Sequence, residues 1–337
     1  MDPQLTHIKD VVIIGAGPTG LACAIEAETQ GLNYLVIEKG CIVNSLKNFP
    51  LQMTFFTTPE LLEIGGMPFV TPYQKPTRLE ALKYYRRVAD TYRLKLHLYE
   101  TVLNIKGRDG EFTIKTETRD QERRIYQARK IVLATGYYDI PNCLNVPGEA
   151  LSKVAHYYRE AHPYYGMDVA VIGGKNSAAV ASLDLYRAGA RVTLIHRGSE
   201  LSQSIKYWIK PDIENRIKAK EITALFDTTV VKVAPRTILL SHRSGKTWSL
   251  DNDFVFAMTG YRPDLEFFKS IGVQLSKLDQ RPLIDKDTYE SNVPGVYLAG
   301  VVVAGMMTNE VFIENGRFHG KVVIHHIRDR LKEWVSS

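Results

Sequence analysis

The chain has 337 residues, of which 45% are hydrophobic, and it carries a formal net charge of +6. This length favours two domains, and so mild a positive charge argues against a nucleic-acid-binding protein. No uncharged apolar run is long enough to cross a bilayer, and residues 1–9 lack a signal-peptide core, so we expect a soluble cytoplasmic protein. The three cysteines, Cys23, Cys41 and Cys143, lie far apart with no CxxC pair. Their spacing predicts neither a disulfide framework nor a metal site.

The strongest signal in the sequence is DVVIIGAGPTG at residues 10–20. A buried strand, a glycine turn and a helical stretch in this order predict a dinucleotide-binding βαβ unit. Gly15 permits the tight turn, Gly17 lets the backbone approach a pyrophosphate, and Gly20 lets the helix pack on the strand. The next predicted strand ends at Glu38, whose carboxylate can accept ribose hydroxyls. An acid here favours FAD or NAD over NADP.

A long segment without helical period follows at residues 39–76 and is rich in Gly, Pro, Phe and Thr. We expect it either to pack on a flat ring, with Thr54 among the polar contacts, or to be an ordinary hydrophobic plug. A helix is predicted next over residues 76–94, with Thr77 as N-cap and Glu80 completing a capping box. Its expected apolar stripe consists of Leu79, Leu82, Tyr85 and Ala89.

Short strands are then predicted over residues 95–99, 101–106, 111–116, 123–127 and 130–134. The backbone at Val102 is a candidate contact for an adenine ring. The last of these strands ends at Thr135 and Gly136, where we expect the chain to leave its first domain. A linker containing Pro141 and Pro147 follows.

A second strand, turn and helix contain GGKNSA at residues 173–178. Here Lys175 replaces the second glycine of the fingerprint and Ala178 the third. This limits backbone approach but places an ammonium group at a helix N-terminus, where it can neutralise a phosphate. The following strand ends at His196 and Arg197, and a cation there suits the 2′-phosphate of NADPH. The residues assigned to this nucleotide are Gly173, Gly174, Lys175, Asn176, Ser177, Ala178, His196 and Arg197.

Strands over residues 221–248 and 253–258 and the exit TGYRPD at 259–264 complete this second domain. A final buried strand and turn are predicted over residues 295–300. Residues 308–320 predict a helix with Thr308 as N-cap, and we expect its N-terminus to face a carbonyl edge that becomes negative on reduction. His325 and His326, in the last amphipathic helix, are expected to be structural.

Two dinucleotide-binding units joined by ATG and TGYRP exits resemble the two-dinucleotide-binding flavoproteins, and their size and order resemble the low-molecular-weight thioredoxin reductases. The resemblance implies an α/β fold of two Rossmann-like domains. It implies an NADPH domain at residues 151–254, inserted into a discontinuous FAD domain at residues 1–150 and 255–337. No CxxC occurs between residues 167 and 248, which excludes ordinary thioredoxin reduction.

A narrower resemblance covers nearly the whole chain. GGKNSAA, HRG, ATGYYDIPN, MTFF and LAGV…FIENGRFHG together are similar to the bacillithiol disulfide reductase (YpdA-type) family. This implies an NADPH-dependent FAD reductase for the disulfide of a low-molecular-weight thiol, active in redox homeostasis and assembled as a dimer or tetramer. It also implies an apolar residue, Val301, where related flavoproteins carry an aspartate. Thr19 stands where thiol-reducing members carry a cysteine in GGGPCG, so a cysteine relay through this position is absent.

The FAD contacts assigned to the first domain lie in the glycine turn, at the acid, in the irregular segment and at the two later turns. They are Gly15, Gly17, Pro18, Thr19, Gly20, Glu38, Lys39, Thr54, Val102, Thr135, Gly136, Gly300, Val301, Phe312 and Ile313.

The leading hypothesis is hydride transfer from NADPH to the flavin, followed by reduction of a small disulfide. No side chain is singled out as a proton donor, and Tyr137, Tyr138, Glu314 and His319 are candidates only because they adjoin motifs. Three alternatives stay open. They are electron transfer to a small redox protein such as ferredoxin or flavodoxin, flavin monooxygenation, and redox sensing without catalysis. The positive net charge favours the first of them, because such acceptors are acidic.

Overall fold

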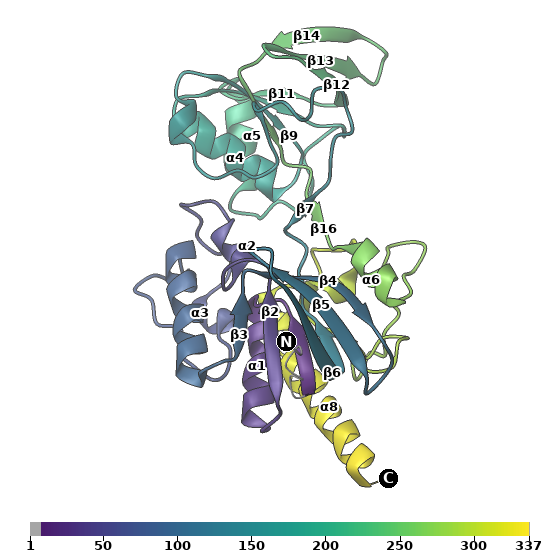
Figure 1. Ribbon diagram of the computed structural model, residues 1–337. Helices are drawn as coiled ribbons and strands as arrows, with labels where there is room; N and C mark the ends of the chain where they lie inside the picture. The colour runs from purple at the N-terminus through teal and green to yellow at the C-terminus, as the bar shows by residue number, and fades with distance from the viewer. Residues whose placement is uncertain (1–7, 337) are drawn as a thin grey trace. The chain divides into compact units, whose positions relative to one another are not determined.

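The computed structural model describes residues 8–336, with side chains described as far as residue 333 (Figure 1). Residues 1–7, which are most of the segment expected to lack a signal-peptide core, lie outside this range. The chain forms two compact units. Unit 1 consists of Met1–Lys47, Met53–Ile140 and Tyr261–Ser337, and unit 2 consists of Asn48–Gln52 and Pro141–Gly260. Along the chain, unit 2 therefore interrupts unit 1 twice, with a short segment at Asn48–Gln52 and its main part at Pro141–Gly260.

Unit 1 is built on a seven-stranded sheet in the order β3-β2-β1-β6-β5-β4, with β17 also paired to β6. The strands are β1 (Lys9–Ile14), β2 (Tyr34–Glu38), β3 (Leu96–Leu98), β4 (Glu100–Lys106), β5 (Phe112–Thr118), β6 (Arg123–Leu133) and β17 (Val296–Leu298). Strands β3, β2, β1, β6 and β17 are parallel, whereas β5 pairs antiparallel with both β4 and β6. The parallel part is the Rossmann-like sheet that the sequence predicted.

The two strands predicted over residues 123–127 and 130–134 are one strand, β6. Ala128 is the reason, because this buried residue pairs with Phe112 of β5 on one side and with Lys9 of β1 on the other. The chain therefore stays extended where the antiparallel part of the sheet passes into the parallel part.

The main helices of unit 1 are α1 (Pro18–Thr29), α3 (Arg78–Tyr92), α6 (Leu265–Ile271) and α8 (His319–Ser336). Helices α1 and α8 pack side by side (Figure 1). The capping box predicted for α3 is present, with Thr77 accepting from Glu80 N–H and Glu80 accepting from Thr77 N–H. Its apolar stripe was predicted only in part, since Leu79 is 53% exposed and the buried side chains are Ala81, Tyr84, Tyr85, Val88 and Ala89.

The prediction of one helix over residues 308–320 is wrong. The chain instead forms a short helix, α7 (Ile313–Gly316), and α8 begins separately at His319. Asn315 explains the difference, because its side chain accepts from Phe312 N–H at 2.8 Å and donates to Glu310 O at 3.0 Å. These bonds close a local turn in place of a first helical turn. No helix starts at Thr308, so no helix dipole is directed from that residue.

The remaining short elements of unit 1 are α2 (Asn44–Lys47) and the 3₁₀ turns η1 (Pro59–Leu62) and η3 (Gly300–Ala304). Part of the predicted ring-packing segment belongs to unit 2, where Leu51 N–H donates to Arg159 O at 2.8 Å. The chain leaves unit 1 at β7 (Ile140–Pro141) and returns at β16 (Tyr261–Arg262), and these two short strands pair with each other.

Unit 2 has a parallel five-stranded sheet in the order β11-β10-β9-β15-β8 and a separate antiparallel sheet, β12-β13-β14. The first sheet contains β8 (Val154–Ala155), β9 (Asp168–Ile172), β10 (Arg191–Ile195), β11 (Thr223–Leu225) and β15 (Phe254–Ala257). The second contains β12 (Thr228–Val233), β13 (Thr237–His242) and β14 (Thr247–Asp251), and the helical elements are α4 (Asn176–Arg187), α5 (Lys210–Lys218) and the 3₁₀ turn η2 (His162–Tyr164). One core contains side chains of α4 and β10, and a second contains side chains of β13 and β15.

Among the described residues, no helix combines the length and the apolar character needed to span a membrane.

Candidate functional site

The first candidate site is the turn between β1 and α1. Gly15 has a φ of +108°, and a Cβ on it would lie 2.4 Å from Ala134 O. A Cβ on Gly20 would lie 1.9 Å from Gly15 O. Neither position can therefore carry a side chain without moving backbone. A Cβ on Gly17 would meet no atom within 4 Å. The turn is thus closed on its protein side and open in front of Gly17.

Glu38 closes one end of this turn. Its buried carboxylate accepts from Ala16 N–H and from Gly40 N–H, both at 2.8 Å. Burial raises the pKa of Glu38, and the two amide hydrogen bonds oppose that effect. Each carboxylate oxygen can accept a second hydrogen bond, so ribose hydroxyls fit here without displacing the amides. The neighbouring Lys39 forms an ion pair with Asp139 at 3.0 Å.

Two unsatisfied groups adjoin the opening in front of Gly17. Helix α1 starts at Pro18 with no side chain capping its first N–H groups. Thr135 Oγ1 is buried and has no hydrogen-bond partner among the described residues. Gly136, the next residue, has a φ of +69°, and a Cβ there would find only Ser45 Oγ at 3.9 Å. An open turn, an uncapped helix N-terminus and a buried hydroxyl fit the phosphate end of a dinucleotide.

Thr19 and His319 hold the segment at the start of η3. A Cβ on Gly300, where φ is +81°, would lie 2.9 Å from Thr19 Oγ1. The N–H of Gly300 donates to Nδ1 of His319 at 3.0 Å, and the His319 ring stacks on Tyr289 at 4.2 Å. Burial lowers the pKa of His319 to about 4. His319 is therefore neutral near pH 7 and acts as a hydrogen-bond acceptor that fixes Gly300, a role the sequence did not reveal.

The other residues predicted to contact FAD all belong to unit 1. Thr54 is exposed and forms an isolated β-bridge with Thr77. Val102 lies beside a register shift in β4. Val301 lies in η3, Phe312 is 50% exposed, and Ile313 begins α7. Of the proposed proton donors, the structure places Tyr137 and Tyr138 beside Tyr261, and burial raises the pKa of both. Glu314 lies in the first turn of α7.

The second candidate site is the turn between β9 and α4, which repeats the first in outline. Gly173 has a φ of +148°, and a Cβ on it would lie 2.5 Å from Met258 O. Lys175 and Ser177 are exposed at the start of α4, Ala178 is buried, and no side chain caps the helix. Arg197 is exposed at the end of β10. Two cations and uncapped helix N–H groups therefore line one turn.

His196 and Asn176 build this second turn from its protein side. The His196 ring packs against Gly174, and a Cβ on Gly174 would lie only 2.3 Å from Cε1 of this ring. Burial, followed by the charge of Arg197, lowers the pKa of His196. The side chain of Asn176 accepts from Lys206 N–H at 3.0 Å and donates to Ser204 O at 3.2 Å. Asn176 thus ties the loop after β10 to the turn, which spacing along the chain could not show.

The three cysteines are all unpaired thiols. Cys23 is buried in α1, and burial, followed by the charge of Glu26, raises its pKa to about 12. Cys23 is therefore an unreactive thiol. Cys41 is half-buried, with Sγ 3.7 Å from Asn44 Oδ1, and Cys143 is exposed.

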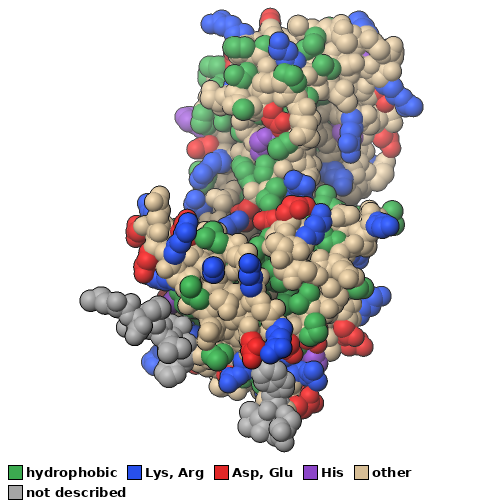
Figure 2. Space-filling model, turned by 45° about the vertical axis from the view of Figure 1, so that its right-hand side comes forward, with side chains coloured by type: hydrophobic (Ala, Val, Ile, Leu, Met, Phe, Trp, Pro, Cys, Tyr) green, Lys and Arg blue, Asp and Glu red, His purple; other side chains and the backbone are tan. Residues whose placement is uncertain are grey.

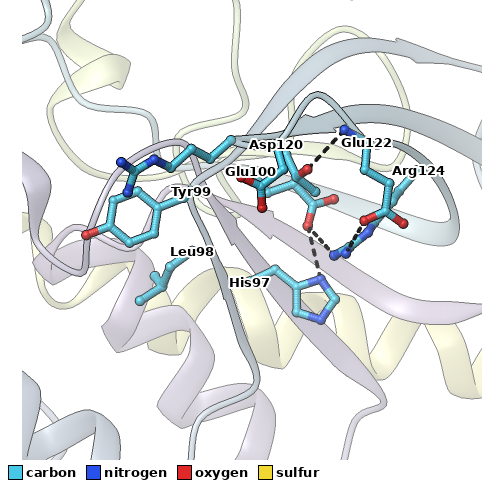
Figure 3. Close-up of a pocket in the computed structure, with 9 residues that line it drawn as sticks. His97, Leu98, Tyr99, Glu100, Asp120, Glu122 and Arg124 are labelled. Carbon is cyan, nitrogen blue, oxygen red and sulfur yellow. Dashed lines mark hydrogen bonds and ion pairs between the residues drawn. The ribbon is translucent and has the colours of Figure 1, made fainter.

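A separate cavity of about 350 Å³ opens beside β3 and β4 (Figure 3). Its centre is Glu100, which is 2% exposed and lies 3.3 Å from His97 Nδ1 and 3.4 Å from Arg124 Nη1. Burial acts to raise the pKa of Glu100, but hydrogen bonds from His97, Thr116 and Tyr126 bring it down to about 2. The charged groups in this cavity therefore satisfy one another, which indicates a structural cluster.

Comparison with known proteins decides between a dinucleotide enzyme and other uses of these turns. Residues 12–300 match the family described as pyridine nucleotide-disulphide oxidoreductase. The chain belongs to this family. It is 45% identical over 323 residues to the bacilliredoxin reductase Bdr of Bacillus subtilis, covering 96% of this chain and 98% of that protein.

Two solved structures of family members are also similar to the chain. The bacillithiol disulfide reductase Bdr (YpdA) from Bacillus cereus is 46% identical, with a TM-score of 0.94 and coverage of 96% of this chain and 100% of that one. The enzyme of the same name from Staphylococcus aureus is 42% identical, with a TM-score of 0.91 and coverage of 96% and 99%. The resemblance and the α/β fold class predicted from the motifs are confirmed.

Membership in the pyridine nucleotide-disulphide oxidoreductase family makes the chain an oxidoreductase that uses FAD and NADPH. The described residues fit both cofactors. Unit 1 offers an open turn, a carboxylate and a buried unpaired hydroxyl, whereas unit 2 offers an uncapped helix N-terminus and two exposed cations. The assignment of individual residues to each cofactor stays a prediction.

Because the space in front of Gly17 is open, a side chain placed there should block the ligand and leave the fold intact. We expect Gly17→Val to give a folded protein that is purified without flavin, because a Cβ at this position meets no protein atom within 4 Å and points into the space assigned to the ligand. Flavin absorbance and circular dichroism measure the two effects. Gly20→Val is the contrasting control and should impair folding itself, since its side chain meets Gly15 O. A yellow Gly17→Val protein would contradict the site.

The Glu100 cluster predicts a pH dependence of stability. The pKa of Glu100 is lowered from 4.5 to about 2, so the ionised group stabilises the fold above about pH 4.5 and this contribution is lost as the pH falls toward 2. Glu100→Gln should therefore show a smaller loss of unfolding free energy than the wild type between those pH values. Denaturant titrations at pH 5 and pH 3 test this. Glu111→Gln, at an exposed carboxylate of the same hairpin, should behave as wild type.

Proposed function

We propose that the protein is an NADPH-dependent FAD reductase that cleaves the disulfide of a low-molecular-weight thiol of the bacillithiol type. The observation that carries the proposal is identity of 42–46% over nearly the full length to three proteins named as bacillithiol disulfide or bacilliredoxin reductases. Among residues 8–333, whose side chains are described, the motif that thioredoxin reductases use, CxxC, is missing. A small disulfide is therefore the favoured oxidant.

We assign FAD to unit 1. Its pyrophosphate would lie in front of Gly17 at the N-terminus of α1, and its ribose hydroxyls would meet Glu38. Thr135 would use its buried hydroxyl toward the same ligand. His319 keeps Gly300 in place at the start of η3, so this backbone is set before the cofactor binds. When bound, FAD supplies a carrier that accepts a hydride from NADPH and passes two electrons to a disulfide.

We assign NADPH to unit 2. Lys175 at the start of α4 would neutralise the pyrophosphate, and Arg197 would bind the 2′-phosphate that distinguishes NADPH from NADH. His196 has a lowered pKa, so its ring supports Gly174 as a neutral group and the cationic contacts fall to Lys175 and Arg197. The overall reaction converts NADPH, one proton and one disulfide into NADP⁺ and two thiols.

Thr19 limits the chemistry of disulfide cleavage. Its hydroxyl cannot form a mixed disulfide, and it packs between Gly300 and Gly316. Cys23, one turn further along α1, is buried with a raised pKa. We therefore propose that the substrate disulfide is cleaved without a protein thiol at the β1–α1 turn.

Parallel assays with NADPH and different oxidants test the proposed substrate class. Bacillithiol disulfide should give a kcat/KM at least about tenfold higher than glutathione disulfide or cystine, which corresponds to a difference of about 1.4 kcal/mol in transition-state binding. Turnover should also change little with salt, because the oxidant is small. Faster reduction of ferredoxin or flavodoxin, or oxygen-dependent hydroxylation, would overturn the substrate class while leaving the cofactors in place.

The face drawn in Figure 2 gives the ferredoxin alternative no specific support. On the face drawn in Figure 2, Lys and Arg side chains of the described residues are scattered among Asp and Glu and form no single basic patch. An acidic protein acceptor would be expected to dock on such a patch. The dimer or tetramer, the cytoplasmic location and the boundaries of the two nucleotide domains stay predictions.

Arg197→Ala tests the cofactor preference. We expect the KM for NADPH to rise on the order of 10- to 100-fold, because one or two charge-assisted hydrogen bonds to the 2′-phosphate are lost. The KM for NADH should change little. Arg236→Ala, an exposed arginine elsewhere in unit 2, is the matched control. An equal effect on both nucleotides would show that Arg197 does not read the 2′-phosphate.

A further inference from the structure

Three side chains with metal-binding atoms converge at the beginning of unit 2. Cys143 follows β7, Glu149 lies in the next turn, and His156 comes directly after β8. One ligand atom from each residue lies within 4.8 Å of the other two. The proposed reductase reaction uses none of these residues.

The spacing of the three groups is close to that of a tetrahedral zinc site. Zinc–ligand bonds of about 2.0–2.3 Å place a nitrogen and an oxygen ligand about 3.4 Å apart, and a sulfur about 3.5 Å from either. Nε2 of His156 already lies 3.3 Å from Oε1 of Glu149. Only the sulfur has to move closer. The sulfur lies within 4.8 Å of the other two ligand atoms, and Cys143 is exposed with a weak thiol contact to Pro141 O at 3.9 Å, so little holds the sulfur away from them.

The carboxylate of this group is held in place before any metal binds. Glu149 accepts from Leu144 N–H at 2.6 Å and from Asn145 N–H at 2.7 Å. These bonds fix its oxygens toward the loop that carries Cys143. The side chains of Glu149 and His156 are 15% and 18% exposed, so water competes weakly for them. The exposed thiol leaves the fourth coordination position facing solvent.

We propose that Cys143, Glu149 and His156 bind one Zn²⁺ ion, with a water molecule as the fourth ligand. A thiolate, an imidazole and a carboxylate together suit Zn²⁺ and disfavour Mg²⁺ and Ca²⁺, which prefer oxygen ligands. Binding replaces the thiol proton by the metal and releases that proton to solvent, so the affinity rises with pH. The bound ion ties residues 143–156 together and blocks the exposed thiol. This revises the expectation, drawn from cysteine spacing alone, that the chain has no metal site.

Zinc binding and thiol protection can be measured on the full-length, flavin-loaded protein. After chelator treatment and desalting, equilibrium dialysis against ZnCl₂ should show one equivalent bound. Maleimide alkylation, followed by mass spectrometry, should show labelling of Cys143 slowed at least about tenfold by Zn²⁺ and not by Mg²⁺, because the thiolate is both the nucleophile and the ligand. Labelling of Cys41 is the internal control and should not change.

Variants test which residues hold the ion. Cys143→Ser and His156→Gln should each weaken zinc binding by about 100-fold or more, since even residues behind the ligands contribute 10- to 100-fold. Cys41→Ser and His162→Gln are matched controls and should bind as wild type. Unchanged binding in Cys143→Ser, less than one equivalent in the wild type, or equal protection of Cys41 would each overturn the site. None of these measurements depends on which disulfide the enzyme reduces.

Discussion

Close approach of three backbone segments at the β1–α1 turn is the constraint on which the rest of unit 1 depends. Gly15 lies against the carbonyl that follows β6, and Gly20 lies against Gly15 itself. No side chain fits at either contact, so β1, α1 and β6 are fixed relative to one another. The same packing leaves the space before Gly17 open. A binding position therefore exists because the protein side of the turn is fully closed.

Unit 2 repeats this strand, turn and helix, but different side chains surround its turn. Gly173 approaches Met258 O as Gly15 approaches Ala134 O, so the two turns share their backbone logic. The strands that follow the two turns end in different charges, because β2 ends in a buried carboxylate whereas β10 ends beside an exposed guanidinium. On the proposed assignment, one fold holds a nucleotide without and a nucleotide with a 2′-phosphate, and the residue at the end of one strand makes the choice.

Features that depend on local pattern could be predicted from the sequence. The two βαβ turns and the Thr77 capping box follow from neighbours within a few residues. Features that depend on tertiary partners could not. The continuity of β6 comes from Ala128 pairing on both edges, and the start of α7 at Ile313 comes from Asn315 closing a turn just before it. The contact of His319 with Gly300 joins residues 19 positions apart, and no local periodicity signals it.

The group formed by Cys143, Glu149 and His156 also depends on tertiary structure and could not be predicted from the sequence. Counting cysteines tests only for sites built from several thiols, and this chain has too few for that. A mixed donor set is invisible to such a count, because Glu149 and His156 are common residues whose spacing matches no motif. Only the loop conformation, held by Leu144 and Asn145 N–H on Glu149, brings the three donors together.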